Sequence, residues 1–114
     1  MNRVLLLEKN KEVADIIARA LADKGRECDV VDKGTDLISR LKENLDVYSS
    51  IFISQSTETA EEVFGYISSI DWVRAFKPIY LITEYMGIAE EAMKRGYTKV
   101  AYKPTIPGIK KQNS

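Results

Sequence analysis

Five short apolar segments of strand character alternate with segments of helical periodicity, and this alternation constrains the fold more than any other feature. The expected strands span residues 4–7, 28–31, 50–54, 79–83 and 100–102. Continuous apolar runs of this kind are typical of strands that are covered on both faces. The alternation predicts one α/β domain with a parallel sheet, right-handed crossovers and helices on both faces. Periodicity alone leaves the order of the strands open.

Capping residues indicate where the expected helices begin and end. Asn10 is a suitable N-cap for the first helix, and Gly25 is placed to close it. For the third helix, Ser56 or Thr57 is the expected N-cap, with Glu58 in the first turn, where the helix dipole favours negative charge. Gly96 is expected to end the fourth helix.

The composition excludes several classes of function. The 17 basic and 17 acidic residues of the 114-residue chain give a formal net charge of zero, so we expect neither nucleic acid nor a membrane as a partner. The absence of histidine excludes catalytic triads that need it and a phosphohistidine relay within this chain. The single cysteine, Cys28, excludes an intramolecular disulfide and fits a cytoplasmic location.

Polar residues gather where the expected strands end. In open parallel sheets, ligands bind beyond the carboxyl ends of the strands. The residues expected at that edge are Glu8, Lys9, Ser54 to Ser56, Thr83, Glu84 and Lys103.

With these elements, the chain resembles a response-regulator receiver domain over roughly residues 3–106. The resemblance rests on the spacing of VLLLEKN, SSIFISQS, YLITE and VAYKP, and the Lys103-Pro104 pair together with Thr83 is its most specific part. It implies a flavodoxin-like (CheY-like) open five-stranded parallel sheet of order 2-1-3-4-5. We expect a receiver-like domain at residues 1–106 and a C-terminal tail at residues 107–114.

The resemblance also assigns roles at the sheet edge. In the family, two acids after the first strand help to hold Mg²⁺, and an aspartate ending the third strand accepts the phosphoryl group. A Thr or Ser after the fourth strand and a Lys after the fifth bind the phosphate. Glu8 falls on the first acid, Lys9 on the second and Ser54 on the acceptor, while Thr83 and Lys103 match the phosphate-binding positions.

The departures from the family pattern predict a degenerate phosphorylation site. Lys9 and Ser54 leave Glu8 as the sole charged metal ligand, so we expect no metal and no cofactor. Ser54 is a poor nucleophile without a histidine base, and Glu84 adds negative charge beside an incoming phosphate. Val100 falls at the position of the usual switching aromatic. We therefore expect a pseudo-receiver that is not an enzyme and that acts through phosphorylation-independent protein contacts.

Three alternatives stay open for the site. Glu8, Lys9 and Lys103 can form a purely structural ion-pair cluster, which we favour over a ligand site. The Lys9/Lys103 cleft can instead bind an anionic small ligand. A working receiver can also exchange phosphate through Ser54 or Glu8.

The partner expected for a pseudo-receiver is a protein: a histidine kinase, another regulator or an output domain. Tyr85 and Tyr102 flank the last two strand ends and are the candidate interface residues. The segment TIPGIKKQNS (residues 105–114) contains Pro107 and Gly108, so we expect a missing or truncated fifth helix and apolar sheet surface left beside the first helix. A longer natural chain, a homodimer or shifted neighbouring helices would each cover that surface.

Overall fold

The computed structural model describes residues 2–96 and the backbone of residues 100–102. Its strands are β1 (Arg3–Leu7), β2 (Glu27–Val31), β3 (Ser50–Ser54), β4 (Ile79–Thr83) and β5 (Val100–Tyr102). All neighbouring strands are parallel and the order is β2-β1-β3-β4-β5. The order of β2, β1, β3 and β4 confirms the sequence-based expectation. For β5 only the backbone pairing with β4 is described, and the expected loss of a fifth helix concerns residues 103–114, outside the described residues.

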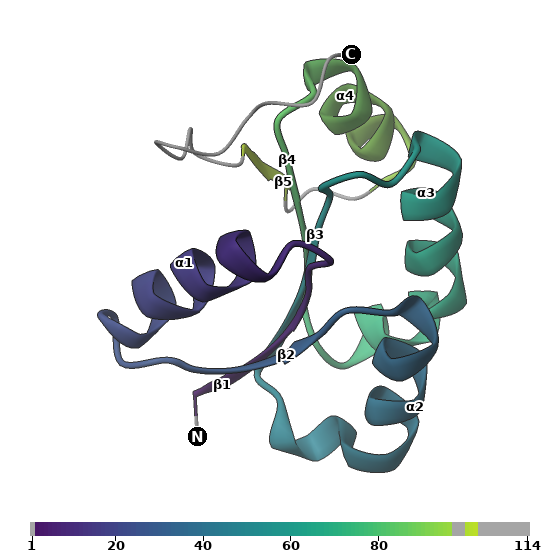
Figure 1. Cartoon of the computed structure of the whole chain (residues 1–114). Coiled ribbons are helices and arrows are strands. Elements are labelled where there is room, and N and C mark those ends of the chain that lie inside the picture. Colours follow the sequence, from purple (N-terminus) through teal and green to yellow (C-terminus); the bar gives the residue numbers. More distant parts are fainter. Residues whose placement is uncertain (1, 97–99, 103–114) are drawn as a thin grey trace.

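Helices cover both faces of the sheet, as the alternation of elements predicts. They are α1 (Lys11–Ala22), α2 (Gly34–Asn44), α3 (Ala60–Ser69) and α4 (Met86–Lys94), with short 3₁₀ turns η1 (Leu45–Val47) and η2 (Asp71–Ala75). Figure 1 shows α1 on one face and α2 and α3 on the other. The carboxyl ends of β1, β3 and β4 therefore meet at one edge, where the candidate site residues lie.

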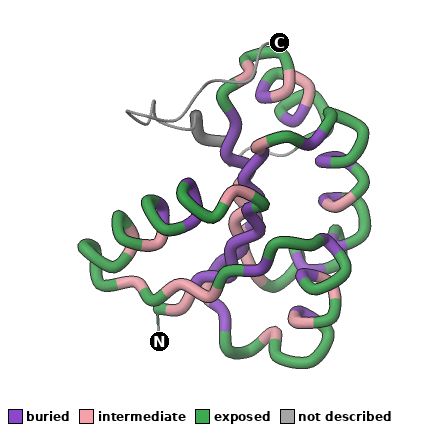
Figure 2. Tube along the Cα trace, viewed as in Figure 1, coloured by how far each residue is buried: buried purple, intermediate pink, exposed green. Residues whose placement is uncertain are grey.

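The core has a larger and a smaller part, one on each face of the sheet. The larger cluster joins alternate strand residues to the apolar sides of α2, α3 and α4, including Leu5, Leu37, Ile51, Val63, Ile67, Leu81 and Ala92. The smaller cluster, beneath α1, consists of Leu6, Val13, Ala14 and Ile17, with Leu21, Cys28 and Phe52 packed against it. Figure 2 shows the buried residues concentrated along the central strands. This burial fixes the strand ends that carry the polar site.

The predicted ends of α1 are confirmed by their hydrogen bonds. The Val13 amide donates to Oδ1 of Asn10 over 3.1 Å. Gly25 has a φ of 78°, and its amide donates to the Ala22 carbonyl over 2.9 Å. A φ in this range suits glycine because it has no Cβ. Gly96 closes α4 in the same way, with a φ of 91°.

The expected N-cap of α3 is wrong. The helix begins after Thr59, not after Ser56 or Thr57, because Thr59 and Glu62 form a capping box in which each side chain accepts a hydrogen bond from the other residue's backbone. Glu58 is therefore not an exposed residue of the first helical turn. It precedes the helix and is buried.

Candidate functional site

A buried carboxylate and a buried hydroxyl meet at the carboxyl edge of the sheet. Glu8 follows β1 and is 1% exposed, and Ser54 ends the adjacent strand β3 and is 0% exposed. The Ser54 Oγ donates to Glu8 Oε1 over 2.6 Å. The amide of Asn10 donates to Glu8 Oε2 over 2.9 Å. Each oxygen of the Glu8 carboxylate thus accepts a hydrogen bond, and such bonds stabilise a buried charge.

Lys9 points its ammonium to α3. Its Nζ lies 3.9 Å from Glu62 Oε2, and both side chains are partly exposed. An exposed pair of this kind contributes at most about 1 kcal/mol. This ion pair links the loop after β1 to the start of α3 and was not predicted, and the cluster expected among Glu8, Lys9 and Lys103 stays a prediction. Lys103 lies outside the described residues.

Thr83 ends β4, where the sequence placed it, and is fully buried. Its hydroxyl donates to Gln55 Oε1 over 2.6 Å and accepts from the Tyr85 amide over 3.0 Å. The sequence placed Gln55 at this edge within the stretch Ser54 to Ser56 but gave it no role. Its position directly after a buried strand was the available signal.

The loop between β3 and α3 is held by side-chain hydrogen bonds. Gln55 Nε2 donates to the Glu58 carbonyl over 2.9 Å, and the Ser56 amide donates to Glu58 Oε1 over 2.8 Å. Gln55 and Glu58 are 4% and 5% exposed. Sequence reasoning missed this buried role of Glu58, because an acid before a helix is usually solvated.

Of the remaining predicted residues, two are described with their side chains and two only by their backbone. Glu84 follows β4 and is exposed, and Tyr85 is the N-cap residue of α4 and is partly buried. Val100 and Tyr102 lie in β5, without described side chains. Neither the switch position nor the Tyr102 interface can therefore be compared with the expectation.

The donor set around Ser54 does not fit a divalent cation. Mg²⁺ requires several oxygen ligands in near-octahedral geometry, usually including carboxylates. Here Glu8 supplies one carboxylate, Ser54 a hydroxyl and Lys9 a cation. Within residues 2–96, no group of three or more metal-ligating acids, cysteines or histidines is assembled.

A groove of about 560 Å³ lies between α1 and α2, over the end of β2, and reaches Glu8 and Lys9. Ser54 and Thr83 do not line it. Its acidic residues, Glu8, Asp15, Asp32, Asp36 and Glu43, outnumber its basic residues, Lys9, Lys11 and Arg40. The groove has the size of a small-ligand site, but its charge does not favour an anion.

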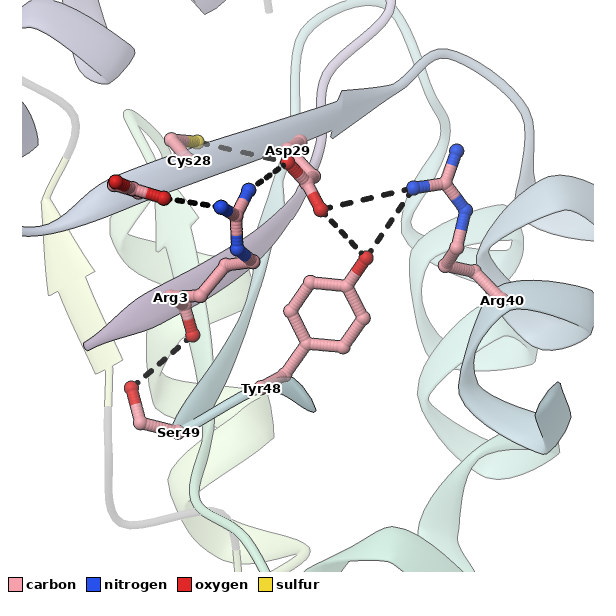
Figure 3. Close-up of polar contacts among 7 residues, drawn as sticks. Arg3, Cys28, Asp29, Arg40, Tyr48 and Ser49 are labelled. Carbon is pink, nitrogen blue, oxygen red and sulfur yellow. Dashed lines mark hydrogen bonds and ion pairs between the residues drawn. The ribbon is translucent and has the colours of Figure 1, made fainter. Parts of the chain in front are cut away.

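A second polar cluster lies on the α2 face of β2 (Figure 3). Asp29 accepts hydrogen bonds from Arg3 over 2.7 Å and from the Tyr48 hydroxyl over 2.8 Å, and Arg40 donates to that hydroxyl over 3.2 Å. Glu27 also pairs with Arg3. The hydrogen bond to Asp29 raises the pKa of Arg3, and burial raises the pKa of the Tyr48 phenol. The cluster joins β1, β2, α2 and the start of β3.

Solved structures identify the fold. A putative pilus assembly-related protein of Burkholderia pseudomallei is similar with a TM-score of 0.73 and 19% identity, over 94% of this chain and 81% of that chain. A CheY-like receiver domain protein of Methanospirillum hungatei gives 0.74 and 13%, over 94% and 85%. The CheY-like protein (tadZ) of Pseudomonas aeruginosa gives 0.71 and 13%, over 93% and 90%.

These similarities show that the chain has the CheY-like fold of response-regulator receiver domains. At such identities they show the fold alone. No family model matches the sequence, and no curated protein matches it. No helix in the described part of the chain has both the length and the apolar character to cross a membrane.

Proposed function

We propose that this chain is a degenerate receiver domain of a two-component-type signalling protein that acts in the cytoplasm through protein contacts and without aspartyl phosphorylation. The observation that carries the proposal is the residue at the end of β3. In place of an acid open to a phosphoryl donor stands Ser54, which is fully buried and donates its hydrogen bond to Glu8. The partner is a histidine kinase, another regulator or an output domain.

Electrostatics also opposes phosphoryl transfer at this edge. The reaction needs cationic groups, usually including Mg²⁺, to neutralise the charge that develops on the phosphoryl oxygens. Glu8 and the exposed Glu84 are negative, and Lys9 pairs with Glu62. Of the three positions that carry acids in the family, only Glu8 keeps a carboxylate, and the acceptor position has a hydroxyl.

Incubation with acetyl phosphate and Mg²⁺, followed by intact-mass measurement, tests this proposal. We expect no added phosphoryl group on the wild-type chain. A stoichiometric gain of one group would overturn the proposal. The matched control is the double variant Lys9→Asp/Ser54→Asp, which restores two carboxylates beside Glu8 and should gain the group if reagent and conditions are adequate.

A second candidate is phosphotransfer through Ser54 or Glu8, and one observation favours it. The lack of histidine suggested that the Ser54 hydroxyl has no base, yet Glu8 Oε1 lies 2.6 Å from it. The full burial of both residues opposes access by a donor. If the wild-type chain does gain mass, a gain that is lost in Ser54→Ala identifies Ser54 as the acceptor. A gain that is kept in Ser54→Ala and lost in Glu8→Gln identifies Glu8.

The anion-sensor alternative has weaker support, because acidic residues outnumber basic residues in the groove beside Lys9. A ligand that binds only the folded state raises the melting temperature. A thermal-shift screen with phosphate, nucleotides and carboxylates should therefore leave it unchanged. A concentration-dependent rise that is lost in Lys9→Ala would favour the sensor.

A further inference from the structure

The side-chain amide of Gln55 joins two loops at the carboxyl edge of the sheet. Its Oε1 accepts from the Thr83 hydroxyl at the end of β4, and its Nε2 donates to the Glu58 carbonyl in the loop before α3. The two ends of one side chain thus hold residues that are 25 positions apart in sequence. Both bonds are buried.

The hydrogen bonds continue outward from both ends of the amide. The Thr83 Oγ1 accepts from the amide of Tyr85, the residue that precedes the first turn of α4. On the other side, Glu58 Oε1 accepts from the Ser56 amide. Linked hydrogen bonds with little access to water are expensive to break singly, because each break leaves an unsatisfied buried group.

We propose that Gln55 is a clamp that couples the loop after β3 to the start of α4 and holds both in one conformation. The Gln55 side-chain oxygen accepts the hydrogen bond of the Thr83 hydroxyl. That hydroxyl has one proton, which is therefore not available to a bound anion. The Tyr85 backbone is fixed through the same hydroxyl. Gln55 is a positioning residue, since it acts through Thr83 and Glu58.

The clamp gives a physical basis for a receiver fold that does not switch. A two-state element responds to a signal only if both arrangements are accessible. Here a movement of Thr83 away from Gln55 breaks a buried hydrogen bond. The clamp itself does not depend on the proposed function, whereas its role in keeping a receiver domain from switching rests on that function.

Hydrogen exchange of single amides tests the clamp in the full chain. Gln55→Met keeps the side-chain size and removes both polar ends. We expect the Tyr85 and Ser56 amides to exchange roughly three- to tenfold faster, the range expected for loss of one hydrogen bond. Thr83→Val should also accelerate Ser56, although Thr83 does not contact that amide. These increases are measured relative to core amides, which report any global loss of stability.

Two further variants separate the clamp from a local packing effect. Gln55→Glu keeps the acceptor for Thr83 and removes the donor to Glu58, so it should accelerate Ser56 more than Tyr85. Thr59→Ala removes the α3 capping box and should accelerate the Glu62 amide while leaving Tyr85 unchanged. The clamp is refuted if, in Gln55→Met, the Tyr85 amide exchanges at its wild-type rate after correction for any change in the core amides. A phosphoryl gain with acetyl phosphate would instead refute the proposed function and leave the exchange result standing.

Discussion

The hydroxyl of Ser54 donates to the carboxylate of Glu8 over 2.6 Å, and this bond ties the carboxyl ends of β3 and β1 together at a point that water does not reach. The backbones of the two strands are already paired, with Leu7 opposite Ile53. The side-chain bond extends this pairing past the end of the strands. The Ser54 hydroxyl and the Asn10 amide thereby hold the Glu8 carboxylate at the sheet edge.

Ser54→Ala tests the contribution of this bond to stability. The variant leaves the buried Glu8 carboxylate with one hydrogen bond fewer, and hydrogen bonds to charged groups contribute about 1.5–3 kcal/mol. We expect the free energy of unfolding, measured with urea, to fall by that amount. Ser69→Ala is the matched control, because the Ser69 Oγ donates to the Gly65 carbonyl at an exposed position and its loss should change stability by less than about 0.5 kcal/mol. Equal effects of the two substitutions would contradict the assignment.

The sequence predicted the elements well because their signals are local. Apolar runs mark β1, β3 and β4, and single residues such as Asn10 and Gly25 mark the ends of α1. The start of α3 was predicted wrongly because a local signal can also occur at several neighbouring residues. Ser56, Thr57 and Thr59 can each cap a helix, and only the folded loop decides among them.

The site was predicted in position but not in its hydrogen bonds. Parallel strands bring Glu8, Ser54 and Thr83 to one edge, and this follows from the order of elements. The donor and acceptor pairs depend on distances of a few ångström between loops, which no periodicity encodes. Hence neither the Gln55–Thr83 hydrogen bond nor the ion pair of Lys9 with Glu62 was foreseen.

Tyr48→Phe probes the polar cluster on the α2 face of β2. The Tyr48 side chain is buried, and its hydroxyl is bonded to both Asp29 and Arg40. Removing the hydroxyl while keeping the ring should lower the free energy of unfolding by about 1–2 kcal/mol, measured with urea. Tyr66→Phe is the control, since no hydrogen bond of its hydroxyl is found among the described residues, and it should be close to neutral.

The Cys28 thiol should make stability depend on pH in the alkaline range. Burial, with a smaller contribution from the charge of Asp29, raises the pKa of Cys28 from 9.0 to about 11. The folded state therefore retains the thiol proton at a pH at which the unfolded chain has lost it. The stabilisation is fully present below pH 9 and is lost as the pH rises towards about 11. Because the thiol is only partly buried, we expect a loss of about 1 kcal/mol.

Urea unfolding at pH 8 and at pH 10.5 measures this dependence, with Cys28→Ala as the control. The variant should lose less stability between the two values than the wild-type chain does. The same pKa predicts slow alkylation of the folded protein at pH 8, because the thiolate is the reactive form. Alkylation as fast in the native state as in urea would contradict a raised pKa.

Two glycine-to-alanine substitutions should change stability in opposite directions. Gly34 begins α2, and a Cβ there would lie 2.6 Å from Cδ1 of Tyr66 and closer still to its Cε1, so the ring of α3 packs directly on the backbone of α2. Gly34→Ala must displace that ring and should destabilise by about 1–3 kcal/mol. Gly65 lies within α3, and a Cβ added there would meet no other atom within 4 Å, so Gly65→Ala should stabilise by up to about 1 kcal/mol through helix propensity. Thermal unfolding of both variants measures the difference.

The double variant Gly34→Ala/Tyr66→Leu should recover part of the loss, because the smaller side chain leaves room for the new methyl group. A Gly34→Ala protein as stable as the wild type would mean that α2 and α3 are not in such close contact.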